Sequence, residues 1–98
     1  MPKLRESARG QPCLVRLPGI CNHDPATTVL AHYRMVGISG AGMKAPDLLG
    51  AFACSDCHDY VDSRRISANL SRDQVKLAHL EGVMRTQAYW ITEGYVTL

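Results

Sequence analysis

The sequence lacks a long apolar run, an internal repeat and a strong excess of one charge. No stretch approaches the roughly 20 apolar residues that a membrane span needs, and residues 1–10 lack the apolar core of a signal peptide. The formal net charge of +2 is too small to identify a nucleic-acid-binding protein by itself. We therefore expect a cytoplasmic protein of one domain, with no membrane partner.

The 98 residues include four cysteines, at positions 13, 21, 54 and 57. A chain this short builds only a modest core, which a structural metal can reinforce. In a reducing cytosol cysteines serve as metal ligands more often than as disulfides. Cys54 and Cys57 have the C-x2-C spacing that lets two thiolates of a single turn bind one metal ion. Cys13 and Cys21 would complete a tetrahedral S4 site for Zn²⁺. The alternatives are four buried thiols without a metal, or His23 in place of one thiolate.

His58 directly follows Cys57, which creates the C-x2-C-H attachment signature of c-type haem. That interpretation requires export to an oxidising compartment, and it leaves Cys13 and Cys21 unexplained. His58 cannot easily turn back to the ion that its neighbour Cys57 holds. We therefore expect His58 to belong to a second site.

Local patterns predict two short apolar segments followed by two helices. Residues 27–33 are rich in β-branched and aromatic side chains and predict a strand, whereas residues 48–53 suit either a strand or a buried helical turn. The glycines between these segments predict a loop. Ser55 is a candidate N-cap for a helix over residues 56–64, which would place His58 and Asp62 at positions i and i+4 on one face.

The longest predicted helix begins after Ser71, where Gln74 completes a capping-box pattern, and it ends near Gly94. Its apolar side chains recur at helical spacing. We expect the stripe that completes the core to consist of Leu77, Leu80, Met84 and Ile91. His79 lies off this stripe and is expected to be solvated.

Residues 1–12 show no periodicity and contain several helix breakers, which predicts an extended arm ahead of one domain over residues 13–98. The arm is locally basic, because its positive side chains face only Glu6. We expect three of them to contact DNA phosphates, namely Lys3, Arg5 and Arg9.

The order of these elements resembles the HNH, or ββα-metal, nuclease motif. The segments LAHYR, GISGAGMKAPDLL and ACSDCHDYVD match its strand with a histidine base, its loop and its CxxCH helix with a further ligand four residues on. The resemblance covers residues 13–64. It is strongest to the YbcO-type nucleases of prophages and more distant to the recombination-enhancement nuclease Ref. It implies an α+β fold, a zinc-stapled ββα-metal domain with a long C-terminal helix.

The resemblance also implies roles for individual residues. His32 corresponds to the general base. Where the family has its central Asn, this chain has Pro46-Asp47, so Asp47 would orient that base or approach the metal, and the missing Asn favours a domain that does not cleave. His58 and Asp62 correspond to ligands of a catalytic Mg²⁺ or Mn²⁺, with Zn²⁺ as an alternative. Further DNA contacts are expected from Arg34, Lys44, Arg64 and Arg65.

The implied activity is metal-dependent DNA endonuclease cleavage in phage recombination or DNA processing, with a recombination protein as an expected partner. This chain has Ala31 where the family often has an Asp or His directly before the base. The departure favours an alternative, in which a zinc-stabilised DNA-binding or adaptor module keeps the fold without cleaving.

Overall fold

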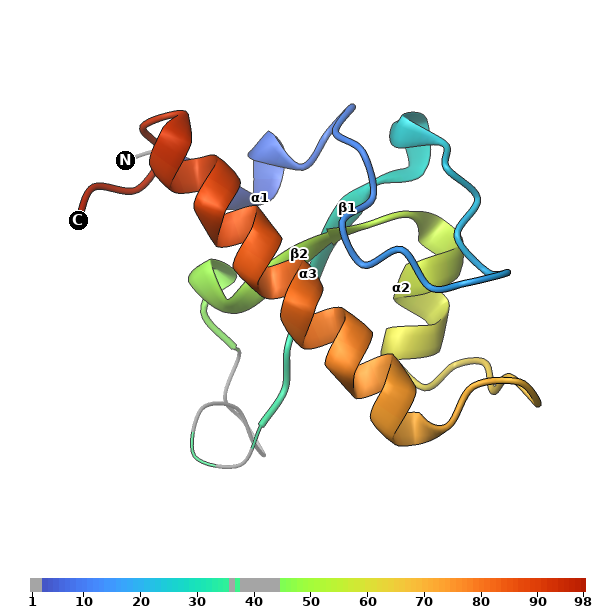
Figure 1. The fold of residues 1–98 in the computed structure, drawn as a ribbon. Helices are drawn as coiled ribbons and strands as arrows, with labels where there is room; N and C mark the ends of the chain where they lie inside the picture. Colours follow the sequence, from blue (N-terminus) through green and yellow to red (C-terminus); the bar gives the residue numbers. More distant parts are fainter. Residues whose placement is uncertain (1–2, 36, 38–44) are drawn as a thin grey trace.

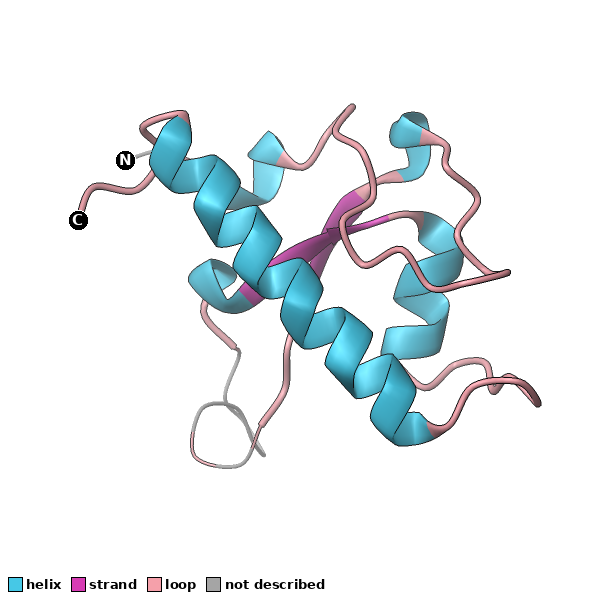
Figure 2. Cartoon of the chain, in the orientation of Figure 1, coloured by secondary structure: helices cyan, strands magenta, loops and turns pink. Residues whose placement is uncertain are grey.

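The computed structural model describes residues 3–35, 37 and 45–98 as a small α+β fold with a two-stranded sheet and a long C-terminal helix, as predicted. Figure 1 shows the longest helix, α3, crossing the sheet, and Figure 2 shows that loops connect most of the elements. In chain order the elements are α1 (Leu4–Ser7), a 3-10 turn (Pro25–Thr27), β1 (Val29–His32), a 3-10 turn (Asp47–Leu49), β2 (Gly50–Ala53), α2 (Ser55–Val61) and α3 (Arg72–Thr92).

The sheet is an antiparallel pair in which Val29 lies opposite Ala53 and His32 lies opposite Gly50. Residues 48–53, for which a strand or a helical turn was expected, form the end of a 3-10 turn followed by strand β2. All of β2 is buried. A Cβ on Gly50 would lie 2.6 Å from the Cγ atom of Leu30, too close for any larger residue without a shift. The pairing fixes the position of His32, the last residue of β1.

The face of α3 that packs on the sheet is not the predicted one. Leu77, Leu80, Met84 and Ile91 are 58%, 42%, 70% and 41% exposed, and therefore the expectation that they complete the core is wrong. The buried face is formed by Val75, His79, Gly82, Val83, Thr86 and Trp90.

Hydrogen bonding to the sheet explains why a partly polar face is buried. The Thr86 Oγ1 atom accepts a hydrogen bond from the backbone N–H of Phe52 at 3.0 Å and donates one to the carbonyl of Gly82 at 2.8 Å. The Nε2 atom of His79 lies 2.9 Å from the carbonyl oxygen of Ala31, and His79 is buried rather than solvated as expected. A two-stranded sheet leaves backbone groups unpaired, and these side chains satisfy two of them.

The segment before Cys13 is not an extended arm over its described residues. It contains the short helix α1, and Ala8 is completely buried in a cluster with Leu30, Phe52 and Trp90. The indole Nε1–H of Trp90 donates to Ser7 Oγ at 2.7 Å, which fixes this segment against the C-terminal half of α3. In the described part of the chain, none of the helices has the length and apolar character needed to cross a membrane.

Candidate metal centre and histidine pocket

Helix α2 carries residues of both candidate sites. It runs over Ser55–Val61, and its N-cap is Cys54 rather than the predicted Ser55, because the Cys54 sulfur accepts a hydrogen bond from the backbone N–H of Cys57 at 3.4 Å. Asp62 is the C-cap, so the helix is shorter than predicted. Adjacent residues of a helix point about 100° apart. Cys57 and His58 therefore face different parts of the molecule.

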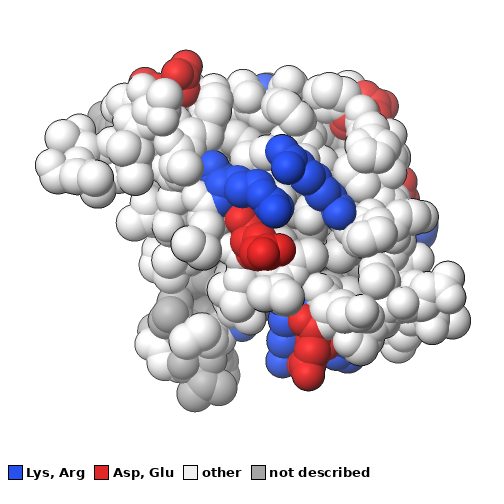
Figure 3. Space-filling model, viewed as in Figure 1, with Lys and Arg blue, Asp and Glu red and all other residues white. Residues whose placement is uncertain are grey.

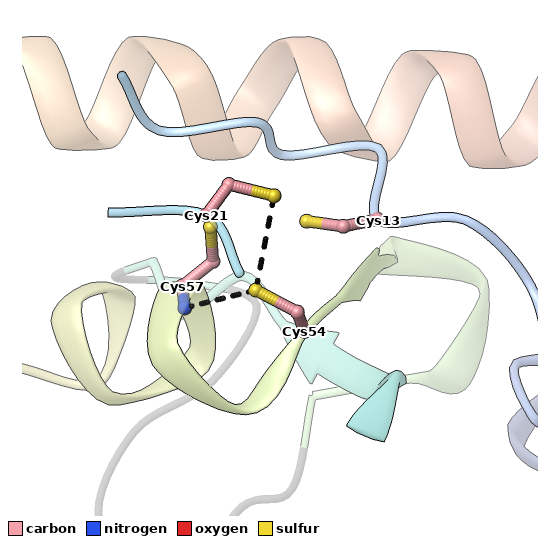
Figure 4. Close-up of side chains that lie close together, drawn as sticks. All are labelled: Cys13, Cys21, Cys54 and Cys57. Carbon is pink, nitrogen blue, oxygen red and sulfur yellow. Dashed lines mark hydrogen bonds between the residues drawn. The ribbon is translucent and has the colours of Figure 1, made fainter. Parts of the chain in front are cut away.

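The four cysteine sulfurs converge beside the start of α2 (Figure 4). All four Sγ atoms lie within 4.8 Å of one another, and those of Cys21 and Cys54 are 3.9 Å apart. In a tetrahedral zinc site with Zn–S bonds of about 2.3 Å, the sulfurs are about 3.8 Å apart. The cluster therefore has the donor atoms and the size to hold one metal ion.

The thiols of Cys13, Cys21 and Cys57 differ widely in pKa. A hydrogen bond from the Cys57 thiol lowers the pKa of Cys13 to about 4, and the backbone N–H of Arg16 supports the same thiolate at 3.5 Å. The contact with Cys13, followed by burial, raises the pKa of Cys57, and burial raises that of Cys21 to about 11. Four neighbouring thiolates repel one another, so complete ionisation of the cluster calls for a cation at its centre.

His23 contacts the cluster from its exposed side. Its Nδ1 atom lies 3.6 Å from the sulfur of Cys21, which is a hydrogen-bonding distance for sulfur. The group of four mutually close donors in the described residues consists of the four cysteines alone. His23 is therefore placed as a partner of the Cys21 sulfur rather than as its substitute.

The C-terminal end of α2 forms part of a pocket of about 180 Å³ that is lined by three of the predicted site residues, His32, Arg34 and Asp62. The His58 Nε2 atom lies 3.1 Å from Asp62 Oδ2, one helical turn further on. Both side chains are largely shielded, with exposed fractions of 27% and 12%. The end of β1 and the end of α2 thus bring His32, His58 and Asp62 into one region.

Asp47 lies beside His32, with 2.7 Å between Asp47 Oδ1 and His32 Nε2. The 3-10 turn that opens at Asp47 leads directly into β2, and Tyr33 donates its backbone N–H to the carbonyl of Leu49 at 2.9 Å. The pairing of the strands therefore sets the position of this carboxylate. Arg5 of α1 also reaches Asp47, at 3.6 Å, which connects the N-terminal segment to the pocket.

The residues predicted to contact DNA lie in different surroundings. Arg34 lines the pocket, and Arg9 is exposed. Lys3 pairs with Glu6 at 3.8 Å, and Lys44 lies outside the described residues. Arg64 is 3.9 Å from Asp62 and Arg65 is 3.5 Å from Asp56, so both are neighbours of carboxylates. On the face shown in Figure 3, two positive side chains lie near each other at the centre and others lie at the lower edge, each group beside acidic side chains.

Helix α3 contributes three residues to the pocket wall that were not predicted from the sequence. Arg72, Lys76 and His79 all line the pocket. Their spacing of i, i+4 and i+7 places them on one helical face, and this polar stripe was the available signal. The prediction followed the apolar stripe along the same helix instead.

The fold and its cysteine cluster define a small α+β domain with one candidate metal centre and a separate histidine pocket. A family model described as "Putative nuclease YbcO" matches residues 2–95 of this chain. The chain therefore belongs to the YbcO family, in agreement with the predicted similarity.

Individual relatives match over almost their entire length. "Putative nuclease YbcO" of Escherichia coli (strain K12) and "Putative nuclease ybcO" of Enterobacteria phage 82 are each 47% identical to this chain over 96 residues, which is 98% of either protein. A solved structure, "Structure of a putative bacteriophage protein from Escherichia coli str. K-12 substr. MG1655", has 43% sequence identity and a TM-score of 0.79. The match covers 94% of this chain and all of that one.

Proposed function

We propose that this protein is a metal-dependent DNA endonuclease of the HNH type, distantly related to Ref, that hydrolyses phosphodiester bonds in phage DNA recombination or processing. The nuclease names of its relatives support the general class. The observation that carries the proposal is the meeting of His32 with Asp62 at one pocket, with the His58–Asp62 pair at 3.1 Å. Hydrolysis needs a proton acceptor and a charge centre near the same phosphate, and these residues supply both.

His32 is the proposed general base. Asp47 is close enough to accept a hydrogen bond from His32 Nε2–H, which leaves the lone pair on Nδ1. A neutral imidazole with one nitrogen fixed in this way can take a proton from water at neutral pH. Asp47 then acts as a positioning residue, because it holds the ring and its tautomer.

His58 and Asp62 are the proposed ligands of the catalytic ion. Their facing atoms are 3.1 Å apart, and neighbouring ligands of an octahedral ion at about 2.1 Å are about 3.0 Å apart. Within the described residues no third His, Cys, Asp or Glu completes a ligand group here, which leaves positions for phosphate and water. A bound Mg²⁺, Mn²⁺ or Zn²⁺ would supply Lewis acidity toward the phosphate oxygens.

The cysteine cluster has a separate role in this proposal. Four thiolates at tetrahedral spacing suit Zn²⁺ and leave no position for a substrate, which is the pattern of a structural site. Residues 13–98 form the proposed nuclease domain, acting in the cytoplasm alongside a recombination protein. Proposed contacts to the DNA backbone are Lys3, Arg5, Arg9, Arg34, Lys44, Arg64 and Arg65.

The test is a plasmid-nicking assay with Mn²⁺ or Mg²⁺. We expect the parent protein to nick supercoiled DNA, and His32→Ala to lower the rate by about 10²- to 10⁴-fold, the usual loss on removal of a general base. His23→Ala is the matched control, because it removes a histidine outside the pocket. Nicking by His32→Ala at the parent rate would contradict the assignment of the base. DNA binding by the parent without any nicking would favour the adaptor-module alternative.

A further inference from the structure

The pocket beside His32 has a strongly cationic wall. Arg34 follows β1, and Arg72 and Lys76 come from the first turns of α3. The acidic residue among those lining the pocket is Asp62, which is already paired with His58. The cavity thus offers three positive side chains to a ligand, beside the histidine and carboxylate of the proposed reaction.

Arg72 is held in place without losing its charge. Its Nη2 atom donates to Ser63 Oγ at 2.6 Å and its Nη1 atom to the carbonyl of Tyr60 at 3.4 Å. Both partners are neutral, so the guanidinium remains available to an anion. Fixed donors of this kind lose little conformational entropy when a ligand binds.

Lys76 has no carboxylate within ion-pairing distance in the described part of the chain, whereas Arg64 and Arg65 each have two. Lys76 lies one helical turn after Arg72, and the buried residues Val75 and His79 anchor this part of α3. The positive end of the helix dipole lies at the same turn. Two uncompensated cations on a rigid helix therefore face a cavity that also contains His32.

We infer that this pocket is a phosphate-binding site, in which Arg72 and Lys76 bind the non-bridging oxygens of the phosphodiester next to His32. The inference rests on the proposed nuclease function and adds α3 to the site. Both residues lie beyond the stretch that resembles the HNH motif. The C-terminal helix then packs on the sheet along its buried face and binds the substrate with Arg72 and Lys76, which lie in its first two turns.

The experiment measures phosphate binding and cleavage separately. Inorganic phosphate is titrated into the zinc-loaded protein while backbone amide NMR signals are followed, and nicking kinetics are recorded with Mn²⁺. We expect Lys76→Gln to weaken phosphate binding by about tenfold and to lower the nicking rate by at least as much, since each lost charged contact removes transition-state stabilisation. Lys76→Arg should restore most of both, and Mn²⁺ affinity should not change.

Arg16→Gln is the charge-matched control, because Arg16 is exposed and lies outside both the pocket and the proposed DNA contacts. It should leave phosphate binding at the pocket unchanged. Unchanged phosphate affinity in Lys76→Gln would overturn the inference whatever happens to nicking. If phosphate binding depends on Lys76 but the protein never nicks DNA, the phosphate-binding site is supported and the nuclease proposal is refuted.

Discussion

The two sides of α2 carry sites of opposite character. On one side four like ligands converge, and Cys54 and Cys57 are inaccessible to solvent. On the other side lies the His58–Asp62 pair, the proposed open metal site, and Asp62 lines a cavity with positive walls. A saturated site can only stabilise the fold, whereas an unsaturated one can bind a substrate. In the proposed function, Cys57 belongs to the closed site and its neighbour His58 belongs to the open one.

The two sites also differ in how they connect the chain. The cysteine cluster joins the loop of residues 13–21 to the start of α2, inside a core cluster that also contains Val83 of α3. The pocket lies between β1, the end of α2 and the start of α3. Loss of the cluster should therefore affect the entire fold, while changes at the pocket should leave it intact.

The largest expected effect comes from opening the cluster. Structural zinc contributes about 10–16 kcal/mol of binding free energy, which exceeds the 5–15 kcal/mol that typically stabilises a domain. We therefore expect Cys57→Ser to lose zinc and cooperative folding, measured by metal analysis and thermal circular dichroism. His23→Ala, beside the cluster, should keep both. A cooperatively folded Cys57→Ser protein without metal would remove the distinction between the two sites.

A smaller effect sharpens the account of how α3 supports the cluster. Val83 and Met84 are neighbours on α3, but Val83 packs in the cysteine-containing core and Met84 is 70% exposed. Val83→Ala should lower the free energy of unfolding by about 2 kcal/mol, whereas Met84→Ala should change it by less than about 0.5 kcal/mol. Denaturant unfolding of the two zinc-loaded variants measures both. Equal losses would show that the exposed stripe is also covered in solution.

Much of this arrangement could be predicted from local sequence signals. The C-x2-C pair, the β-branched strand and the capping box at Ser71 each depend on residues within one turn or one strand, and the structure contains all three. The i, i+4 relation of His58 and Asp62 followed from helical geometry alone. Such features are predictable because their partners are close in sequence.

Apart from the bounds and N-cap of α2, the main errors concern partners that are distant in sequence. Thr86 is buried because it bonds to Phe52, and His79 because it bonds to Ala31, so neither burial could be inferred from hydrophobic periodicity. The N-terminal segment is held by Trp90, 83 residues after its partner Ser7. The pocket-lining residues of α3 were not predicted for a similar reason, since a polar helical stripe normally indicates a solvated face.

The most direct test of the two-site account is a calorimetric titration of Mn²⁺ into zinc-loaded protein, with zinc content measured before and after. The parent protein should bind one Mn²⁺ per chain without releasing zinc. His58→Ala should keep its zinc but lose at least about tenfold in Mn²⁺ affinity, because even outer partners of metal ligands contribute 10- to 100-fold. Two results would contradict the claim that one helix separates a closed site from an open one. They are an unchanged Mn²⁺ affinity in His58→Ala, or a His58→Ala protein that loses its zinc as well as its Mn²⁺ affinity.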